Sequence, residues 1–170
     1  MAVALQIKTN AKEVSQKFKG IESILPRLID KGLLQAGFQL LDIVKTKTQK
    51  GIDFNDKPFA PYSQGYLKKL QAEGKPTNVD LFYSGRMLGS LTPDSTVKSR
   101  GKNIVTLAFN NSEMRTRALF NQVLGKNQRE FFGFNERTKQ IIQRSFNLFM
   151  QKEFRRYTAW VKEKILLVIY

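Results

Sequence analysis

Two residue types that carry much of protein chemistry are missing from this 170-residue sequence, which contains no cysteine and no histidine. Without cysteine the chain cannot form a disulfide, a thiolate nucleophile or a sulfur-ligated metal site. Without histidine it also lacks the commonest general base near neutral pH and the catalytic arrangements built on it. We therefore expect no catalytic residues, no bound metal and no cofactor.

Long apolar runs are missing as well. No stretch approaches the roughly 18 to 20 apolar residues that a membrane span requires, and the apolar residues 165–170 are far too few. Residues 1–8 lack the charged region and the apolar core of a signal peptide. We expect a protein without a membrane partner that is made in a cytoplasm-like compartment.

Acidic residues are scarce relative to basic ones, with 14 Asp and Glu against 29 Lys and Arg and a formal net charge of +15. Such a charge implies an acidic partner, and the alternatives are nucleic acid, an anionic membrane surface or an acidic protein ring. The content of 41% hydrophobic and 11% aromatic residues is typical of a folded chain. We expect one domain over residues 1–170, with 151–170 as a C-terminal extension that packs on a neighbouring subunit.

The segment 51–63 is the most distinctive part of the chain. Pro58 and Pro61 each fix one backbone dihedral and disfavour helical geometry in the residue before them. Aromatic residues alternate with the prolines and provide apolar anchors, either on the chain's own scaffold or on a partner. A long loop with such anchors is typical of a functional segment, so the loop is a candidate interface, and packing on the chain's own scaffold is the equally open alternative.

Hydrophobic periodicity predicts an α+β fold, in which a small antiparallel β-sheet is flanked by helices, with one long helix in the N-terminal half and another at the C-terminus. Gly20 is expected to end a first short helix, and Pro26 suits the first turn of the next one. Strands are predicted over 3–7, 95–99 and 104–110, and helices over 11–18, 24–50, 64–72, 84–91, 114–124 and from a cap at Asn135 onward. The last helix exceeds 25 residues, so its end is expected to reach beyond the domain.

Three segments follow one another in a recognisable order: Lys57-Pro58-Phe59-Ala60-Pro61-Tyr62-Ser63, then Leu81-Phe82-Tyr83-Ser84-Gly85-Arg86-Met87-Leu88-Gly89-Ser90, then Arg129-Glu130-Phe131-Phe132-Gly133-Phe134. With a long helix before them and a hairpin between them, they resemble the bacteriophage virion-morphogenesis, or tail-completion, proteins over residues 20–150. Members of that family often carry a His-Gln pair where this chain reads Asn121-Gln122, and a Trp where it has Phe59.

The resemblance implies a structural virion protein of a tailed bacteriophage. Such a protein forms a homo-oligomeric ring, expected to be a hexamer, in the neck at the head–tail junction or at the top of the tail, where it acts as a terminator or connector. Its partners would be other neck, portal-adaptor and tail-tube proteins, with genomic DNA passing through the lumen and assembly in the host cytoplasm.

A ring with rotational symmetry needs a heterologous interface, in which one patch meets a different patch of the next subunit. Exposed aromatic loops and an apolar C-terminal end are features that supply one. The candidate interface residues are Phe54, Pro58, Phe59, Pro61, Tyr62, Arg129, Phe132, Trp160 and Tyr170.

Two other classes of function remain open at this point. A basic nucleic-acid-binding module is the main alternative, because basic residues with interleaved aromatics over 152–164 could follow phosphates and stack bases. An enzyme is less favoured, since the carboxylates are scattered over the sequence without a spacing that pairs two of them, and a Walker-type phosphate loop is absent.

Overall fold

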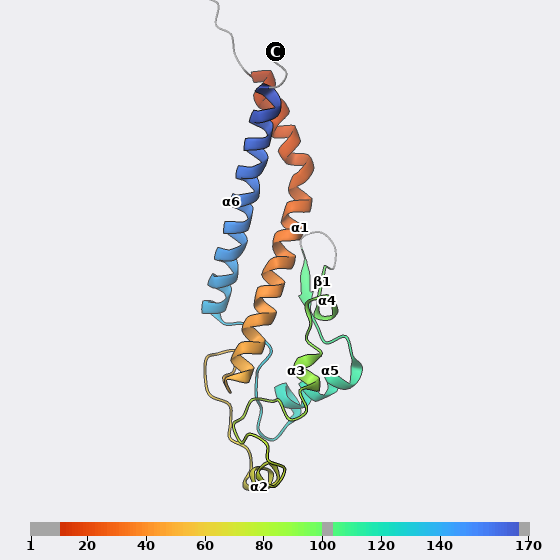
Figure 1. Ribbon diagram of the computed structural model, residues 1–170, viewed down its shortest axis with the longest axis vertical. Coiled ribbons are helices and arrows are strands. Elements are labelled where there is room, and N and C mark those ends of the chain that lie inside the picture. Colours follow the sequence, from red (N-terminus) through yellow and green to blue (C-terminus); the bar gives the residue numbers. More distant parts are fainter. Residues whose placement is uncertain (1–10, 100–103, 167–170) are drawn as a thin grey trace, which may run out of the picture.

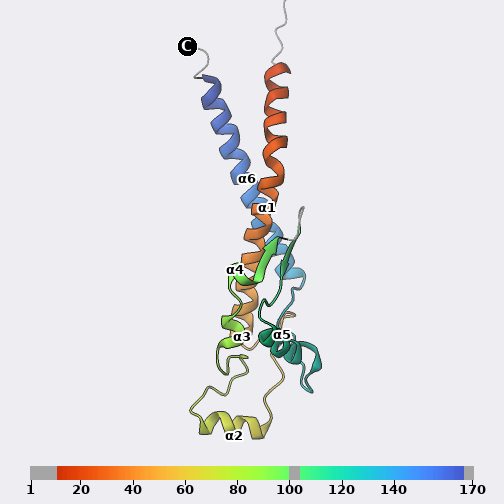
Figure 2. The same cartoon turned by 90° about the vertical axis from the view of Figure 1, so that its right-hand side faces the viewer.

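The computed structural model describes residues 11–99 and 104–166, and it shows an elongated, mostly helical molecule. Two long helices, α1 (Ala11–Gln49) and α6 (Glu136–Leu166), run side by side, and the shorter elements gather near the Gln49 end of α1 (Figure 1). Figure 2 shows the same arrangement from the side, with α2 at the far end of the molecule. The two long helices predicted from the sequence are confirmed.

Helix α1 is continuous where the sequence predicted two helices, so the expected break at Gly20 and helix start near Pro26 are wrong. Gly20 lies within the helix, at a point where α6 comes close to α1. A Cβ atom at this position would collide with the Tyr157 hydroxyl of α6. Pro26 lies inside α1, where its missing N–H removes one backbone hydrogen bond. Packing of an amphipathic face along α6 outweighs these local preferences.

The antiparallel contact between α1 and α6 is close because small residues of α1 face aromatic rings of α6. A Cβ atom at Gly32 would lie 2.8 Å from the Phe146 ring and 3.0 Å from the Phe149 ring. Helix α6 begins as the sequence predicted, with the Asn135 side chain accepting a hydrogen bond from the Thr138 N–H at 2.9 Å.

The expected β-sheet does not form a layer of the fold. Only three-residue strands are present in the described part of the chain, β1 (Val97–Ser99) and β2 (Val105–Leu107), which pair antiparallel. The predicted strand 95–99 is shortened because Pro93 opens a helical turn, α4 (Pro93–Thr96). The hairpin packs against α1, while the predicted strand 3–7 lies outside the described residues.

The short helices agree only in part with the prediction. Helix α2 (Gln64–Ala72) has the predicted bounds and begins after Ser63, whose hydroxyl accepts a hydrogen bond from the Tyr66 N–H at 3.3 Å. Helix α3 (Arg86–Gly89) is shorter than predicted and is preceded by Gly85 rather than Ser84 as its cap. Helix α5 (Ser112–Leu119) continues into a single π-helical turn, η1 (Phe120–Leu124).

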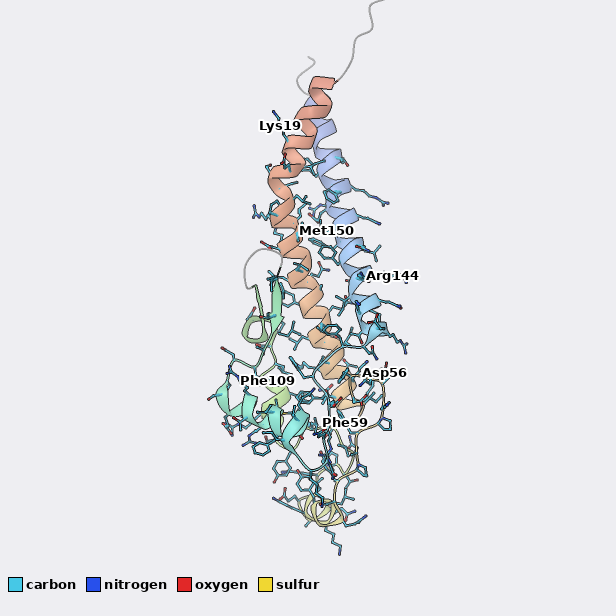
Figure 3. The ribbon with its side chains drawn as sticks, turned by 180° about the vertical axis from the view of Figure 1, so that it is seen from behind. Lys19, Asp56, Phe59, Phe109, Arg144 and Met150 are labelled. Carbon is cyan, nitrogen blue, oxygen red and sulfur yellow. The ribbon has the colours of Figure 1, made fainter. Side chains whose placement is uncertain are left out.

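The core lies where the lower half of α1 meets these short elements. Phe59 and Phe109 both lie in this lower body, as Figure 3 shows, whereas Met150 and Arg144 lie higher, on α6. The buried members of the core come from α1, α3, α5 and the loops around them: Leu41, Val44, Phe59, Met87, Leu88, Leu91, Phe109, Met114, Ala118 and Phe131.

Candidate functional site

The Pro-rich loop, residues 51–63, is an ordered turn that closes on itself. Ile52 and Pro58 form an isolated antiparallel bridge. Inside the loop, the Asp53 N–H donates to the Lys57 carbonyl at 2.8 Å, and the Lys57 N–H donates to the Asp53 carboxylate at 2.8 Å. The loop therefore has a defined conformation before any partner binds.

Asp56 ties this loop to both long helices. Its carboxylate lies 2.7 Å from the Lys47 ammonium on α1, and it accepts a 2.7 Å hydrogen bond from the Asn135 side chain at the start of α6. The hydrogen bond from Lys47, and after it the one from Asn135, holds the pKa of Asp56 below its usual range. The residue also adopts a left-handed backbone conformation with φ of 65°.

Arg129 holds the other end of the loop. Its guanidinium group donates to the Ala60 carbonyl at 3.1 Å and to the Pro61 carbonyl at 3.3 Å. The same group lies 4.9 Å from the centroid of the Tyr62 ring. A planar guanidinium suits this double role, because its edge donates in a fork while its face rests on a ring.

The segment that begins with Arg129 is itself held on both sides. The Phe54 N–H donates to the Glu130 carbonyl at 3.0 Å, and the Phe54 ring covers Gly133, where a Cβ atom would come within 2.9 Å of it. On the opposite side, the Gln122 amide exchanges two 3.0 Å hydrogen bonds with the Phe132 backbone. Gln122 thus takes the place of a neighbouring strand.

The three segments that the sequence analysis singled out, 57–63, 81–90 and 129–134, therefore pack around one core. Phe59 contributes from the Pro-rich loop, Met87 and Leu88 from the second segment, and Phe131 from the third. Phe59 is only 8% exposed and Phe131 only 1%. This convergence makes the segments parts of a single structural unit, although they are far apart in the sequence.

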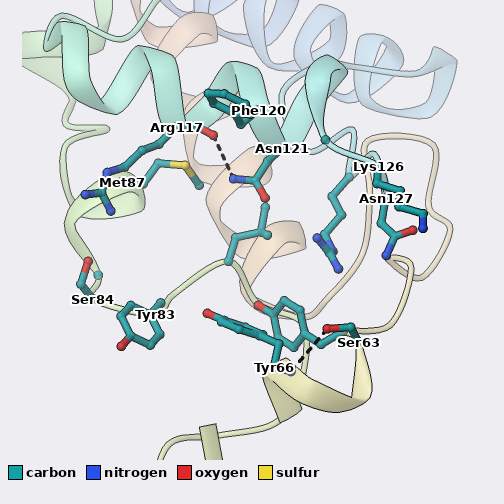
Figure 4. Close-up of a pocket in the computed structure, with 15 residues that line it drawn as sticks. Ser63, Tyr66, Tyr83, Ser84, Met87, Arg117, Phe120, Asn121, Lys126 and Asn127 are labelled. Carbon is teal, nitrogen blue, oxygen red and sulfur yellow. Dashed lines mark hydrogen bonds between the residues drawn. The ribbon is translucent and has the colours of Figure 1, made fainter. Parts of the chain in front are cut away.

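A groove with a volume of about 510 Å³ lies beside the Arg129 clamp. Tyr62, Tyr66 and Tyr83 line one wall, and Figure 4 shows the two labelled tyrosines, Tyr66 and Tyr83, facing Phe120 and Arg117 across it. The second wall is formed by α5, η1 and the turn that follows η1. We call this feature the α2–η1 groove.

The tyrosines of the groove form a packed row. Tyr62 and Tyr66 meet edge to face with ring centroids 4.8 Å apart, and Tyr66 and Tyr83 are 6.3 Å apart. Burial raises the pKa of both Tyr62 and Tyr66, so these hydroxyls stay protonated at neutral pH. The Lys75 ammonium lies 3.5 Å from the centroid of the Tyr83 ring, whose hydroxyl donates to Glu73 at 2.9 Å.

The charged side chains along the groove are all basic among the described residues that line it: Arg117, Lys126 and Arg129. Arg117 pairs with Glu113 at 2.8 Å, but the same carboxylate also pairs with Arg86 at 3.3 Å. Two guanidinium groups therefore share one negative charge. Neither Lys126 nor Arg129 forms an ion pair with a residue that the structure describes, so the groove keeps a net positive charge.

The described lining of the groove combines cationic, phenolic and apolar groups. A pair of carboxylates for acid–base chemistry is absent from the described lining, and no cluster of three potential metal ligands occurs within 11–99 and 104–166. Positive charge, phenol hydroxyls and apolar ring surface together suit an anionic ligand that also carries an apolar part.

The candidate interface residues of the sequence are divided between several settings. Tyr62 and Arg129 line the groove, Pro58 and Pro61 are exposed, and Phe59 belongs to the core. The others are placed as follows: Phe54 and Phe132 are partly buried, the side chain of Trp160 is outside the described part of the structure, and so is Tyr170.

Sequence reasoning did not select Tyr83, Arg117, Phe120 or Lys126 as site residues. Lys126 follows Gly125, the predicted helix stop, which was the one local signal of a turn there. The groove arises because residues 62–87 and 117–129 lie opposite each other. Such a long-range juxtaposition has no signature in periodicity or spacing.

No protein-family model, curated protein or solved structure matches this chain. None of the helices within the described ranges is both long enough and apolar enough to cross a lipid bilayer.

Proposed function

We propose that this chain is a structural protein of a tailed bacteriophage that assembles into a ring in the neck or at the top of the tail. It would complete the tail and join it to the head through contacts with neck, portal-adaptor and tail-tube proteins. The resemblance of three sequence segments to tail-completion proteins supports the viral part of the proposal. Their convergence on one core agrees with a shared structural unit.

Exposed apolar surface is the observation that supports assembly of the chain into a ring. Four large apolar side chains on α5 and η1 are about half exposed: Leu119 at 47%, Phe120 at 55%, Val123 at 52% and Leu124 at 58%. We call these four residues the η1 patch. A contiguous exposed apolar patch on a globular protein is typical of a contact surface.

A different apolar patch lies on α6, where Ile141 is 41% exposed and Leu148 is 57% exposed. The two residues are two helical turns apart, so they share one exposed face of α6. We call them the α6 patch. Figure 1 shows α6 and α5 on different sides of α1, and two unlike patches on different helices suit head-to-tail closure of a ring.

The proposal is tested by measuring the mass of the purified protein with light scattering at low and high salt, with and without duplex DNA. We expect one discrete oligomer of ring size whose mass does not depend on DNA. Ile104→Asp is the control, because Ile104 is 53% exposed but belongs to neither patch. This variant should assemble like the wild type.

A monomer that binds DNA with a steep salt dependence would instead support the nucleic-acid-binding alternative. One observation favours that alternative. Arg137, Arg144 and Arg155 recur along one face of α6 and form no ion pair with a described residue. Ile141 and Leu148 lie beside this stripe, however, and apolar side chains favour a protein partner over a phosphate backbone.

A further inference from the structure

We propose that the α2–η1 groove binds a short acidic, partly apolar segment of another protein. This goes beyond assembly of the ring, since a monomer presents the same groove to a partner. Charge complementarity and the distribution of carboxylates in this sequence lead to this occupant.

The first step is the charge of the groove. Lys126 and Arg129 bring two positive charges that no described carboxylate neutralises, and Arg117 and Arg86 share the single carboxylate of Glu113. Arg129 is also fixed in place by its two carbonyl contacts, so little side-chain freedom is lost when it meets an anion. A ligand carboxylate would complete these interactions.

The second step separates a peptide from a nucleic acid. Single-stranded nucleic acids bind by stacking bases on open aromatic faces. Here Lys75 covers one face of Tyr83 at 3.5 Å, Arg129 covers one face of Tyr62 at 4.9 Å, and the edge-to-face contact with Tyr66 occupies more ring surface. The tyrosines of the groove therefore offer partly covered rings and hydroxyls, which suit carboxylate and amide groups, and Phe120 is left as an exposed apolar ring.

The third step identifies the ligand as part of a different protein. No two of the 14 Asp and Glu residues in this sequence are closer than three positions apart. The closest two, Asp53 and Asp56, are bound to Lys57 and Lys47 within the same chain. A second copy therefore has no acidic segment to offer.

The apolar side of the ligand follows from the rest of the lining. Phe120 is 55% exposed at the groove, and Met87 lies at its base with 7% exposure. An aliphatic or aromatic side chain beside the carboxylates would cover Phe120. The ligand is thus a segment in which acidic and apolar residues are interspersed.

The experiment is a selection from a random displayed peptide library on three proteins: the wild type, Lys126→Glu, and Lys31→Glu as the matched control. Lys31 is an exposed residue of α1 and does not line the groove. We expect peptides with net negative charge and at least one large apolar residue to be enriched on the wild type and on the control. Fluorescence anisotropy should show about tenfold weaker binding of a selected peptide to Lys126→Glu.

Several outcomes would overturn this assignment. The selection would contradict it by enriching peptides without negative charge or by yielding no binder. The anisotropy measurements would contradict it if affinity is unchanged when Asp and Glu of a selected peptide are replaced by Asn and Gln, or if Lys31→Glu loses as much binding as Lys126→Glu. The same anisotropy assay with single-stranded DNA is the competing arm. The groove would be assigned to nucleic acid if the selection yields no acidic peptide and if the wild type binds DNA more tightly than Lys126→Glu does. Circular dichroism of each variant checks that the fold is retained.

Discussion

Asp56 connects the Pro-rich loop to α1 and α6 through one carboxylate, and this predicts how stability depends on pH. Because its pKa is lowered in the folded state, the ionised form stabilises the fold at neutral pH. That stabilisation is complete above the unfolded pKa and is lost as the pH falls through the folded pKa, which means below about 4. We expect Asp56→Asn to lower the melting temperature at pH 7, with a difference from the wild type that narrows toward pH 3.

Asn is the suitable replacement because it tolerates the left-handed conformation that Asp56 adopts, so the variant reports on charge rather than on backbone strain. Asp42→Asn, at an exposed position of α1, is the matched control and should show a much smaller change at pH 7. A difference between Asp56→Asn and the wild type that stays constant from pH 7 to pH 3 would contradict an electrostatic role.

At the scale of elements, two glycine-to-alanine substitutions are expected to have opposite signs. Gly65 in α2 has no atom within 4 Å of its would-be Cβ, so Gly65→Ala should stabilise the protein by about 0.5–1 kcal/mol. Gly32 in α1 faces Phe146 and Phe149, so Gly32→Ala should destabilise it by about 1–2 kcal/mol. Urea denaturation gives the free energy of unfolding of both variants. Stabilisation by Gly32→Ala would show that the α1–α6 contact is looser than described.

The elements that the sequence predicted well are those set by local chemistry. Helix α2 has the predicted bounds, and Ser63 caps its start; the start of α6 follows from the predicted cap Asn135. Gly20 was misread as a helix stop because its role depends on Tyr157, which lies far away in the sequence. The sheet was overestimated because alternation of apolar residues extends beyond the three paired positions of β2 (Val105–Leu107).

The candidate site divides in the same way. The Pro-rich loop and Arg129 were both selected from the sequence as candidate interface residues, and hydrogen bonds join the two segments. Their role as an interface stays a prediction. The hydrogen bonds of Gln122 were not predicted. The sequence marked Asn121-Gln122 only as the place of a His-Gln pair in the family that it resembles, whereas the Gln122 amide exchanges two hydrogen bonds with the Phe132 backbone. An amide side chain can both donate and accept, but the fold determines which backbone groups it meets.

At the scale of the whole molecule, the two apolar patches allow head-to-tail assembly to be distinguished from face-to-face pairing. Leu124 in the η1 patch and Leu148 in the α6 patch are 58% and 57% exposed, so Leu124→Asp and Leu148→Asp are closely matched variants. If the η1 patch of one subunit meets the α6 patch of the next, each variant alone has no intact contact and stays monomeric.

An equal mixture of the two variants should behave differently from either one. Leu124→Asp keeps an intact α6 patch and Leu148→Asp keeps an intact η1 patch, so these two patches form one contact. The remaining patches of the pair are both substituted, so no further subunit can be added. We expect light scattering to show heterodimers in the mixture and monomers in each separate sample. Face-to-face pairing through the η1 patch would give a different pattern, because Leu148→Asp would then dimerise alone and mixing would add nothing.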